Sequence, residues 1–358
     1  MGIEAVAMIY SEHGDPLKVL RPVKFSVPEP EAGQVVVQLL AAPINPSDLL
    51  QIDGTYPLRP PKTKEFDPET PSAVGGIEGV FKVVKLGSNV SSCNEGDWVI
   101  PQKGSSTWRS HAVFDAEELL VIPESLRSGL KPLQAATVSV NPTTADLMFD
   151  QYTTMNTGDW FIQNGGNSGL GRTAIQLAHL RGIKSINVIR NRSDKDEIAK
   201  QLTDLGGDIV ITENELQEES FPEILKQKTG GVLPKLALDC VGGKTTASLA
   251  NSLANGGHFI TYGSMTGENV QIPPWLLVFK DIHVHGFWLT SWAAKTGGRG
   301  DLILKLLDYI RQGKLKDVPF TIHEYAVDSK SPEAFADAFR DAIDADNKRK
   351  GKQAVVLV

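Results

Sequence analysis

The sequence contains few of the features that would assign it to several large classes of protein. Its two cysteines, Cys93 and Cys240, are too few for a disulfide framework or a four-cysteine zinc lobe, and they fit a reducing compartment. No apolar run approaches the length of a membrane span. The formal net charge of −7 argues against nucleic acid or an anionic membrane as a partner. We therefore expect no nucleic acid partner and no membrane span.

The N-terminal residues, MGIEAVAMIY, have neither the charged start of a secretory signal peptide nor the arginine-rich pattern of an organellar presequence. From these residues alone, we expect either a cytosolic chain or one whose presequence has been removed. A length of 358 residues predicts two domains, each able to bury its own core.

The most informative stretch is the glycine-rich segment 160–171, WFIQNGGNSGLG. Its first residues predict a short buried strand, and the apolar spacing of residues 172–181 predicts a helix that packs on a sheet. A strand, a glycine turn and a helix together bring backbone N–H groups up to a diphosphate. The spacing is a variant of the dinucleotide fingerprint, so a plain tight turn is the alternative interpretation.

The next predicted strand, residues 184–190, ends in basic residues. Nucleotide sites that prefer NAD place a carboxylate near this point, but here Arg190, Asn191 and Arg192 occupy it. Two guanidiniums match a 2′-phosphate in charge and geometry, whereas a solvated strand end is the alternative. Because these arginines follow a glycine turn at the expected distance, we favour binding of a 2′-phosphate, and therefore NADPH over NADH.

The first third of the chain predicts a compact β-rich domain, because short apolar or alternating runs lie between turn residues. The predicted strands are 5–10, 34–42, 79–86, 97–101 and 111–114. Residues 132–155 predict a helix that is broken around Asn141-Pro142.

From residue 159 to about 287, strands and helices alternate regularly, which predicts a doubly wound parallel sheet. The expected strands are 160–164, 185–190, 208–211, 235–240, 257–262 and 283–287, and the expected helices are 169–182, 194–205, 218–228 and 244–254. A helix at 301–313, a strand at 321–326, a helix at 331–345 and a strand at 353–358 are expected to return to the first domain.

This organisation resembles the medium-chain dehydrogenase/reductase superfamily and, within it, the zinc-free mitochondrial trans-2-enoyl thioester reductases, the fungal members above all. The stretches that carry the resemblance are 43–48, 75–79, 96–101, 104–109, 140–142, 236–244, 261–263 and 286–289. The resemblance implies an α/β fold with two parts. A GroES-like catalytic and substrate domain takes residues 1–142 and 289–358, and a Rossmann-type NADP-binding domain takes residues 143–288.

The residues also argue against a catalytic zinc. Zinc-dependent relatives have a Gly-His-Glu motif where this chain has Gly-Gly-Ile-Glu-Gly at 75–79, with no histidine. A catalytic zinc needs about three converging ligands, and His283 and His285 alternate on a predicted strand. We expect no metal.

Without a Lewis acid, reduction of an activated C=C bond fits better than alcohol oxidation. Hydride would go to Cβ of a trans-2-enoyl thioester, and a phenol would give a proton to Cα, because a pKa near 10 keeps a phenol protonated. The family resemblance places this donor at Tyr56, in the loop 51–57. On the residues alone, a tyrosine beside a proline is more often a surface packing residue.

The resemblance further implies a set of cofactor-binding residues. Asn141 would contact the nicotinamide end, although an Asn-Pro turn that ends a helix explains it equally well. Lys352 matches a family lysine near the cofactor, but a run of charges near a C-terminus is usually solvated. The remaining expected contacts, at the diphosphate turn and at the ends of two strands, are Asn167, Ser168, Gly169 and Leu170, then Tyr262, Gly263, Ser264 and Met265, then Phe287, Trp288 and Leu289. An ordinary turn is the alternative for residues 262–265, and a pair of core aromatic residues is the alternative for Phe287 and Trp288.

The apolar stretch 273–292 carries five large aromatic residues and predicts an exposed sheet edge. We expect a homodimer that continues the sheet across this edge, as the family relatives do, and an acyl group bound in a cleft between the domains. The resemblance also implies a mitochondrial matrix enzyme whose substrate is carried by coenzyme A or by acyl carrier protein.

Two other functions compete with this one. A zinc-free NADPH-dependent quinone or enone reductase would share the fold and cofactor but would not depend on Tyr56. A non-catalytic protein that kept the nucleotide fold is the third hypothesis, and the retained Tyr56, glycine turn and arginine pair argue against it.

Overall fold

The computed structural model describes residues 2–103, 106–348 and 351–358. Gly104 and Ser105, which begin one of the family-like stretches, lie outside the described residues. The chain forms two compact units: unit 1 contains residues 1–140, 299–311 and 319–358, and unit 2 contains residues 141–298 and 312–318.

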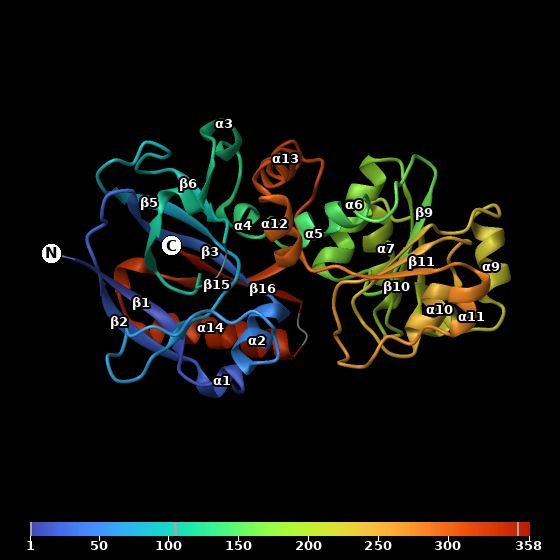
Figure 1. The fold of residues 1–358 in the computed structure, drawn as a ribbon, viewed down its shortest axis with the longest axis horizontal. Helices are drawn as coiled ribbons and strands as arrows, with labels where there is room; N and C mark the ends of the chain where they lie inside the picture. The colour runs from blue at the N-terminus through green and yellow to red at the C-terminus, as the bar shows by residue number, and fades with distance from the viewer. Residues whose placement is uncertain (1, 104–105, 349–350) are drawn as a thin grey trace. The chain divides into compact units, whose positions relative to one another are not determined.

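Unit 2 is built on a parallel six-stranded sheet with the strand order β11-β10-β9-β12-β13-β14 (Figure 1). The order reverses beside β9, as in doubly wound folds. The strands are β9 (Trp160–Gln163), β10 (Lys184–Ile189), β11 (Ile209–Thr212), β12 (Leu236–Asp239), β13 (His258–Thr261) and β14 (His283–Gly286). The helices are α5 (Asn141–Met148), α6 (Gly169–Leu180), α7 (Lys195–Asp204), α8 (Glu213–Leu216), α9 (Phe221–Lys228), α10 (Thr245–Asn251), α11 (Pro274–Phe279) and α12 (Leu289–Thr296).

Both faces of this sheet are covered by helices, and the alternation of side chains along β10 shows how. Ile186 and Val188 join a buried cluster with residues of α8, α9, α10 and α11. Ile189, which points the opposite way, packs with Ile175 of α6 and with α7. These strands are apolar on both faces because a parallel sheet is buried on both faces. The predicted α/β fold with a doubly wound sheet is therefore confirmed.

Unit 1 is mostly β-structure. A seven-stranded sheet has the order β15-β16-β3-β5-β6-β8, with β7 also paired to β3, and a three-stranded sheet has the order β2-β1-β4. The strands are β1 (Ile3–Tyr10), β2 (Arg21–Val27), β3 (Gln34–Ile44), β4 (Ala73–Val74), β5 (Val80–Leu86), β6 (Trp98–Pro101), β7 (His111–Asp115), β8 (Leu119–Ile122), β15 (Phe320–Tyr325) and β16 (Lys352–Leu357). The α-helices are α1 (Pro16–Val19), α2 (Pro46–Asp53), α3 (Glu124–Arg127), α4 (Pro132–Ala136), α13 (Gly300–Arg311) and α14 (Pro332–Asn347).

The C-terminal segment returns to unit 1 and pairs with a strand from the N-terminal part of the chain. Strand β16, red in Figure 1, pairs antiparallel with the blue strand β3, so that Gln353 lies opposite Ile44. Helix α14 buries Phe335 and Phe339 in the same core as Trp108. This return of the C-terminal segment brings side chains from opposite ends of the sequence together.

Several elements differ from the prediction. Residues 149–155 are not helical, and the predicted helix break lies at residues 137–140 rather than at Asn141. Asn141 begins α5, and Pro142 fits there because the first turn of a helix needs no N–H bond from it. The prediction missed three strands and six short α-helices, which are β2, β4 and β8 and α1, α2, α3, α8, α11 and α12. None of the described helices combines the length and the apolar character that a membrane span requires.

Candidate nucleotide and substrate site

In unit 2, the glycine-rich segment joins β9 to α6. Ser168 is the N-cap residue of α6, and its hydroxyl accepts the N–H of Gly171 at 3.0 Å. The next residues, Gly169 and Leu170, form the first turn of the helix, where N–H groups have no acceptor within the helix. Asn167 lies just before the cap, and its carbonyl accepts the Nε–H of Arg172 at 3.1 Å.

The glycines in this turn are required by close packing. A Cβ on Gly171 would lie 2.6 Å from the carbonyl oxygen of Gly165, and a Cβ on Gly165 would lie 2.7 Å from Sγ of Cys240. Gly165 also has a φ of +58°, which favours glycine. The glycines therefore let the turn pack closely against the N-terminus of α6, and we call residues 165–171 the cradle. Backbone N–H groups at such a helix N-terminus favour an anion such as a diphosphate.

The basic residues predicted to select the cofactor follow β10 directly. Arg190, Asn191 and Arg192 are all exposed. The guanidinium of Arg192 forms an ion pair with Asp194, so it shares its charge with a carboxylate two residues away. Of the two arginines, Arg190 is therefore the one whose charge is less offset by a neighbouring carboxylate and can better attract a phosphate.

The other predicted contacts of unit 2 follow the carboxyl ends of β13 and β14, the edge where parallel sheets bind ligands. Met265 lies in the turn after β13, where its N–H donates to the carbonyl of Cys240 at 2.9 Å. Tyr262 and Gly263 are partly buried, and Ser264 is exposed. Phe287 and Leu289 are buried, whereas Trp288 between them is exposed.

A buried carboxylate that the sequence prediction missed ties these strand ends together. Asp239, at the end of β12, accepts the Nδ2–H of Asn164 at 2.6 Å and the hydroxyl of Thr261 at 3.1 Å. It also accepts the N–H groups of Val241 and Gly242. Asp239 therefore fixes the ends of β9, β12 and β13 in one arrangement. Asp239 could have been found from the sequence, because it is the one charged residue at the end of the apolar strand Leu236–Asp239.

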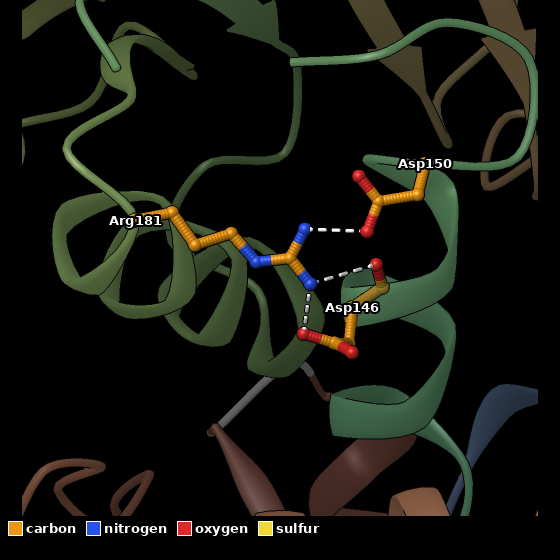
Figure 2. Close-up of polar contacts among 3 residues, drawn as sticks. All are labelled: Asp146, Asp150 and Arg181. Atoms are coloured by element: carbon orange, nitrogen blue, oxygen red, sulfur yellow. Dashed lines mark hydrogen bonds and ion pairs between the residues drawn. The ribbon is translucent and has the colours of Figure 1, made fainter. Parts of the chain in front are cut away.

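Asn141 begins α5, and an ion-pair cluster fixes this helix to α6. Arg181, the C-cap residue of α6, donates to the carboxylate of Asp146 and, at 2.7 Å, to that of Asp150 (Figure 2). The guanidinium also lies 5.5 Å from the ring centroid of Phe149. The helix that carries Asn141 is thereby held on the helix that follows the glycine turn.

In unit 1, Tyr56 lies just beyond α2. The helix ends at Gly54, whose φ of +91° is left-handed and whose Cβ would meet the ring of His13 at 2.9 Å. The chain then turns back, so that the N–H of Tyr56 donates to the carbonyl of Leu50 at 2.8 Å. Tyr56 is partly buried. Its backbone position is thus set by α2.

Lys352 belongs to a cluster of buried polar side chains and is not part of a solvated charge run. Its Nζ donates to Oδ1 of Asn45 at 3.3 Å, and Nδ2 of Asn45 donates to Oε2 of Glu78 at 2.9 Å. Asn45 and Glu78 are 3% and 2% exposed. Both residues lie in stretches that carry the family resemblance, but the sequence prediction gave neither of them a role in the site.

A second carboxylate joins this cluster. Asp48 accepts the N–H groups of Asn45 at 2.7 Å and Ile77 at 2.8 Å, so it ties the start of α2 to the loop before β5. Burial raises the pKa of Asp48 to about 7 and also raises the pKa of Glu78. Burial lowers the pKa of Lys352, while Asp346, Glu78 and Asp48 oppose that change.

Among the described residues, no group of three or more histidine, cysteine, aspartate or glutamate side chains could hold a metal ion. Glu78, at the position of the zinc-type motif, already accepts hydrogen bonds from Asn45, Ser139 and Val140. Ile77 takes the place of the histidine, so the local residues do not form a catalytic zinc site.

Comparisons with known proteins agree with this architecture. Residues 31–124 match the alcohol dehydrogenase GroES-like domain, and residues 169–299 match the zinc-binding dehydrogenase family. These two matches and the glycine turn define a dinucleotide-dependent oxidoreductase of the medium-chain type.

Individual relatives narrow this class. The mitochondrial enoyl-[acyl-carrier-protein] reductase of Yarrowia lipolytica is 40% identical over 352 residues, which is 98% of this chain and 91% of the relative. The 2-enoyl thioester reductase Etr1p/Etr2p heterodimer of Candida tropicalis matches with a TM-score of 0.93 and 38% identity, over 99% of this chain and 100% of that one. A complex of Etr1p with NADP and crotonyl-CoA matches with a TM-score of 0.92, at the same identity and coverage. This chain belongs to the family of mitochondrial enoyl thioester reductases.

Proposed function

We propose that this protein reduces trans-2-enoyl thioesters to saturated acyl thioesters with NADPH, as the last reductive step of mitochondrial fatty-acid synthesis. The observation that carries the proposal is the 40% identity, along nearly the whole chain, to an enoyl-[acyl-carrier-protein] reductase. The match to a structure named as a complex with NADP and crotonyl-CoA supports both the cofactor and the substrate class. Relatives named as mitochondrial support the mitochondrial matrix as its location.

NADPH supplies a hydride when it is bound. In the mechanism that we propose, the cradle at Asn167, Ser168, Gly169 and Leu170 holds the diphosphate, because its N–H groups and helix dipole favour negative charge. Arg190, with Asn191 and Arg192, selects the 2′-phosphate. The remaining cofactor contacts are Asn141 at the nicotinamide end, residues 262–265 and 287–289 after the two strands, and Lys352.

Tyr56 gives the proton. Hydride addition at Cβ of an enoyl thioester leaves negative charge at Cα and on the thioester oxygen. The phenol of Tyr56 then transfers its proton to Cα, and the fixed backbone of the loop after α2 limits where that hydroxyl can lie. In this proposal, the proton donor Tyr56 belongs to unit 1, which contains the residues that match the GroES-like domain. The glycine turn that binds the nucleotide belongs to unit 2.

The proposed assembly is a homodimer formed along β14. The N–H group of His283 donates to the carbonyl of Gly257, just before β13, and that of Phe287 donates to Thr261 of β13. By strand alternation, the peptide groups of Val284 therefore point away from β13. Nearby, α11 exposes Trp275, Val278 and Phe279, the last with 80% of its surface accessible. Tyr152 donates to the carbonyl of Gly286 at 2.8 Å, but no strand of the described residues pairs with the outer edge of β14. Such an edge beside exposed apolar side chains suits a second copy.

Light scattering tests this assembly and should give twice the chain mass of 38.8 kDa. The variant Phe279→Glu should shift the mass toward one copy, because the charge would be buried in the interface. A single-copy mass at every concentration of the unchanged protein would contradict the homodimer.

The main experiment measures NADPH oxidation with trans-2-hexenoyl-CoA, alongside NADH, in the unchanged protein and in Tyr56→Phe. We expect NADPH-selective turnover, and a fall in kcat of about 100-fold or more in the variant, because a general acid contributes that much. Equal unfolding temperatures of the two proteins are the control. If the variant keeps its turnover, another group or water must donate the proton.

The same assay with a quinone and with a thioester-free enone separates this function from its rival. Consumption of quinone without thioester reduction would favour a zinc-free quinone or enone reductase. Parallel measurements with enoyl groups on coenzyme A and on acyl carrier protein would define the carrier.

A further inference from the structure

Asn45 connects two charged groups that come from distant parts of the sequence of unit 1. Its side-chain amide accepts from the ammonium of Lys352 at 3.3 Å and donates to the carboxylate of Glu78 at 2.9 Å. Asn45 and Lys352 are 307 residues apart in sequence. An asparagine suits this position because one side chain supplies both an acceptor for the cation and a donor for the anion.

The groups on both sides of this bridge are fixed independently. The carboxylate of Glu78 accepts the hydroxyl of Ser139 at 3.1 Å and the N–H of Val140 at 2.8 Å. Lys352 begins β16, whose pairing with β3 places Gln353 opposite Ile44. The backbone of Asn45 donates to Asp48. The side chain of Asn45 therefore joins two supports that are already in place.

The charges around Lys352 come from three elements. Asp346 of α14, Glu78 before β5 and Asp48 of α2 each raise the pKa of Lys352, against the burial that lowers it. Burial raises the pKa of Glu78, and the nearby charge of Arg299 opposes that change. The three carboxylates favour the charged ammonium, but burial outweighs them and the pKa of Lys352 is lowered. The side-chain oxygen of Asn45 contacts the ammonium directly and also favours its charged form.

We propose that Asn45 is a positioning residue for the cofactor site: by bridging Glu78 to Lys352, it holds the Lys352 ammonium in the orientation that meets NADPH. This proposal rests on the cofactor role of Lys352 in the proposed function. It adds Asn45 and Glu78 to the residues on which NADPH affinity depends, although neither needs to touch the cofactor.

The first test is NADPH binding without substrate, followed by the fluorescence of the bound nucleotide. Asn45→Ser keeps a residue that can begin α2 but is too short to reach both charged groups. We expect the Kd for NADPH to rise about tenfold, the effect of losing one hydrogen bond to a charged group. The matched control is Asn94→Ser, because the N–H of Asn94 also donates to an aspartate three residues on, but at an exposed site. This control should leave the Kd unchanged.

A double-mutant cycle separates positioning from general structural damage. In a Lys352→Met background, Asn45→Ser should change the NADPH Kd by less than about twofold, because the group that it positions is gone. An equal loss of affinity in both backgrounds would overturn the proposal. Melting temperatures of all four proteins show whether each variant is folded.

A second readout does not depend on the cofactor. Acetic anhydride labels neutral amines, so mass spectrometry of Lys352 across pH reports how well the ammonium is held in the free protein. Asn45→Ser should shift the labelling of Lys352 toward lower pH, because the contact that favours the charged form is lost. An unchanged labelling profile would overturn the proposal that Asn45 holds the Lys352 ammonium. A shifted profile combined with an NADPH Kd unaffected by Lys352→Met would support the bridge but remove Lys352 from the cofactor site.

Discussion

The candidate residues of the two units are held in place in different ways. In unit 2, the cradle is contiguous in sequence and is made of backbone: Gly165, Gly171 and the start of α6 approach one another so closely that side chains have no room. In unit 1, the cluster around Lys352 is made of side chains whose positions span most of the chain. The first kind of site is specified by local conformation and the second by the pairing of distant strands.

This difference determines how each part should respond to substitution. A backbone cradle is sensitive to added atoms and tolerant of changes in polar side chains, because its N–H groups do the binding. A buried polar cluster is sensitive to the loss of any one donor or acceptor, because each remaining partner is left without a bond.

The largest expected effect is from Gly171→Ala. The new Cβ would lie 2.6 Å from the oxygen of Gly165 and 2.7 Å from that of Gly166, so the turn and α6 must separate. Overpacking of this kind costs about 3 kcal/mol, which corresponds to a rise of about 100-fold in the Kd for NADPH. Titration of the nucleotide against the purified variant measures the change.

Gly230→Ala is the control for that change. Gly230 has a positive φ of +65° but open space where its Cβ would be, at an exposed position of the same unit. It should cost some stability without weakening NADPH binding. If Gly171→Ala bound NADPH normally, the glycine turn would not be a close-fitting backbone cradle.

The next effect, in unit 1, is from Glu78→Gln. The glutamine has the same shape, but its NH₂ group must face one of the donors that now bond to Glu78 (Asn45, Ser139 or Val140). A buried donor without an acceptor costs about 2 kcal/mol, so the free energy of unfolding in urea should fall by about that amount. The exposed Glu95 offers the matched control Glu95→Gln, which should leave the midpoint unchanged. A neutral outcome at Glu78 would mean that the cluster tolerates loss of its charge.

Residues close in sequence could be predicted well. The strand, glycine turn and helix at 160–180 were found from spacing and composition, because all the atoms of that turn lie within one short segment. The alternation that predicted the doubly wound sheet is likewise a local pattern, and the sheet forms as expected.

Residues that meet only through tertiary structure could not be predicted. Asn45, Asp48 and Glu78 lie in family-like stretches of the sequence, but their contacts with one another and with Lys352 join segments that are far apart in the chain. Lys352 was identified by resemblance alone, and local composition suggested a solvated position. In the aromatic stretch at 273–292, Trp275, Phe279 and Trp288 are exposed as expected for a sheet edge, whereas Phe287 is buried, and the sequence pattern did not separate the two kinds. Burial depends on neighbours that a sequence window does not contain.

The smallest expected effect tests the contrast most directly. Ser168 is the one residue of the cradle whose side chain has a clear structural task, since its hydroxyl accepts the N–H of Gly171. Ser168→Ala removes that cap and should cost about 1 kcal/mol of stability in unit 2. If the diphosphate is held by backbone groups, the Kd for NADPH should rise only about threefold, because the substitution removes no backbone N–H group from the turn. Ser168→Thr, which can restore the cap, should recover the loss of stability. A fall in NADPH affinity as large as that expected for Gly171→Ala would show that the cradle depends on a side chain, and the contrast between the two units would then fail.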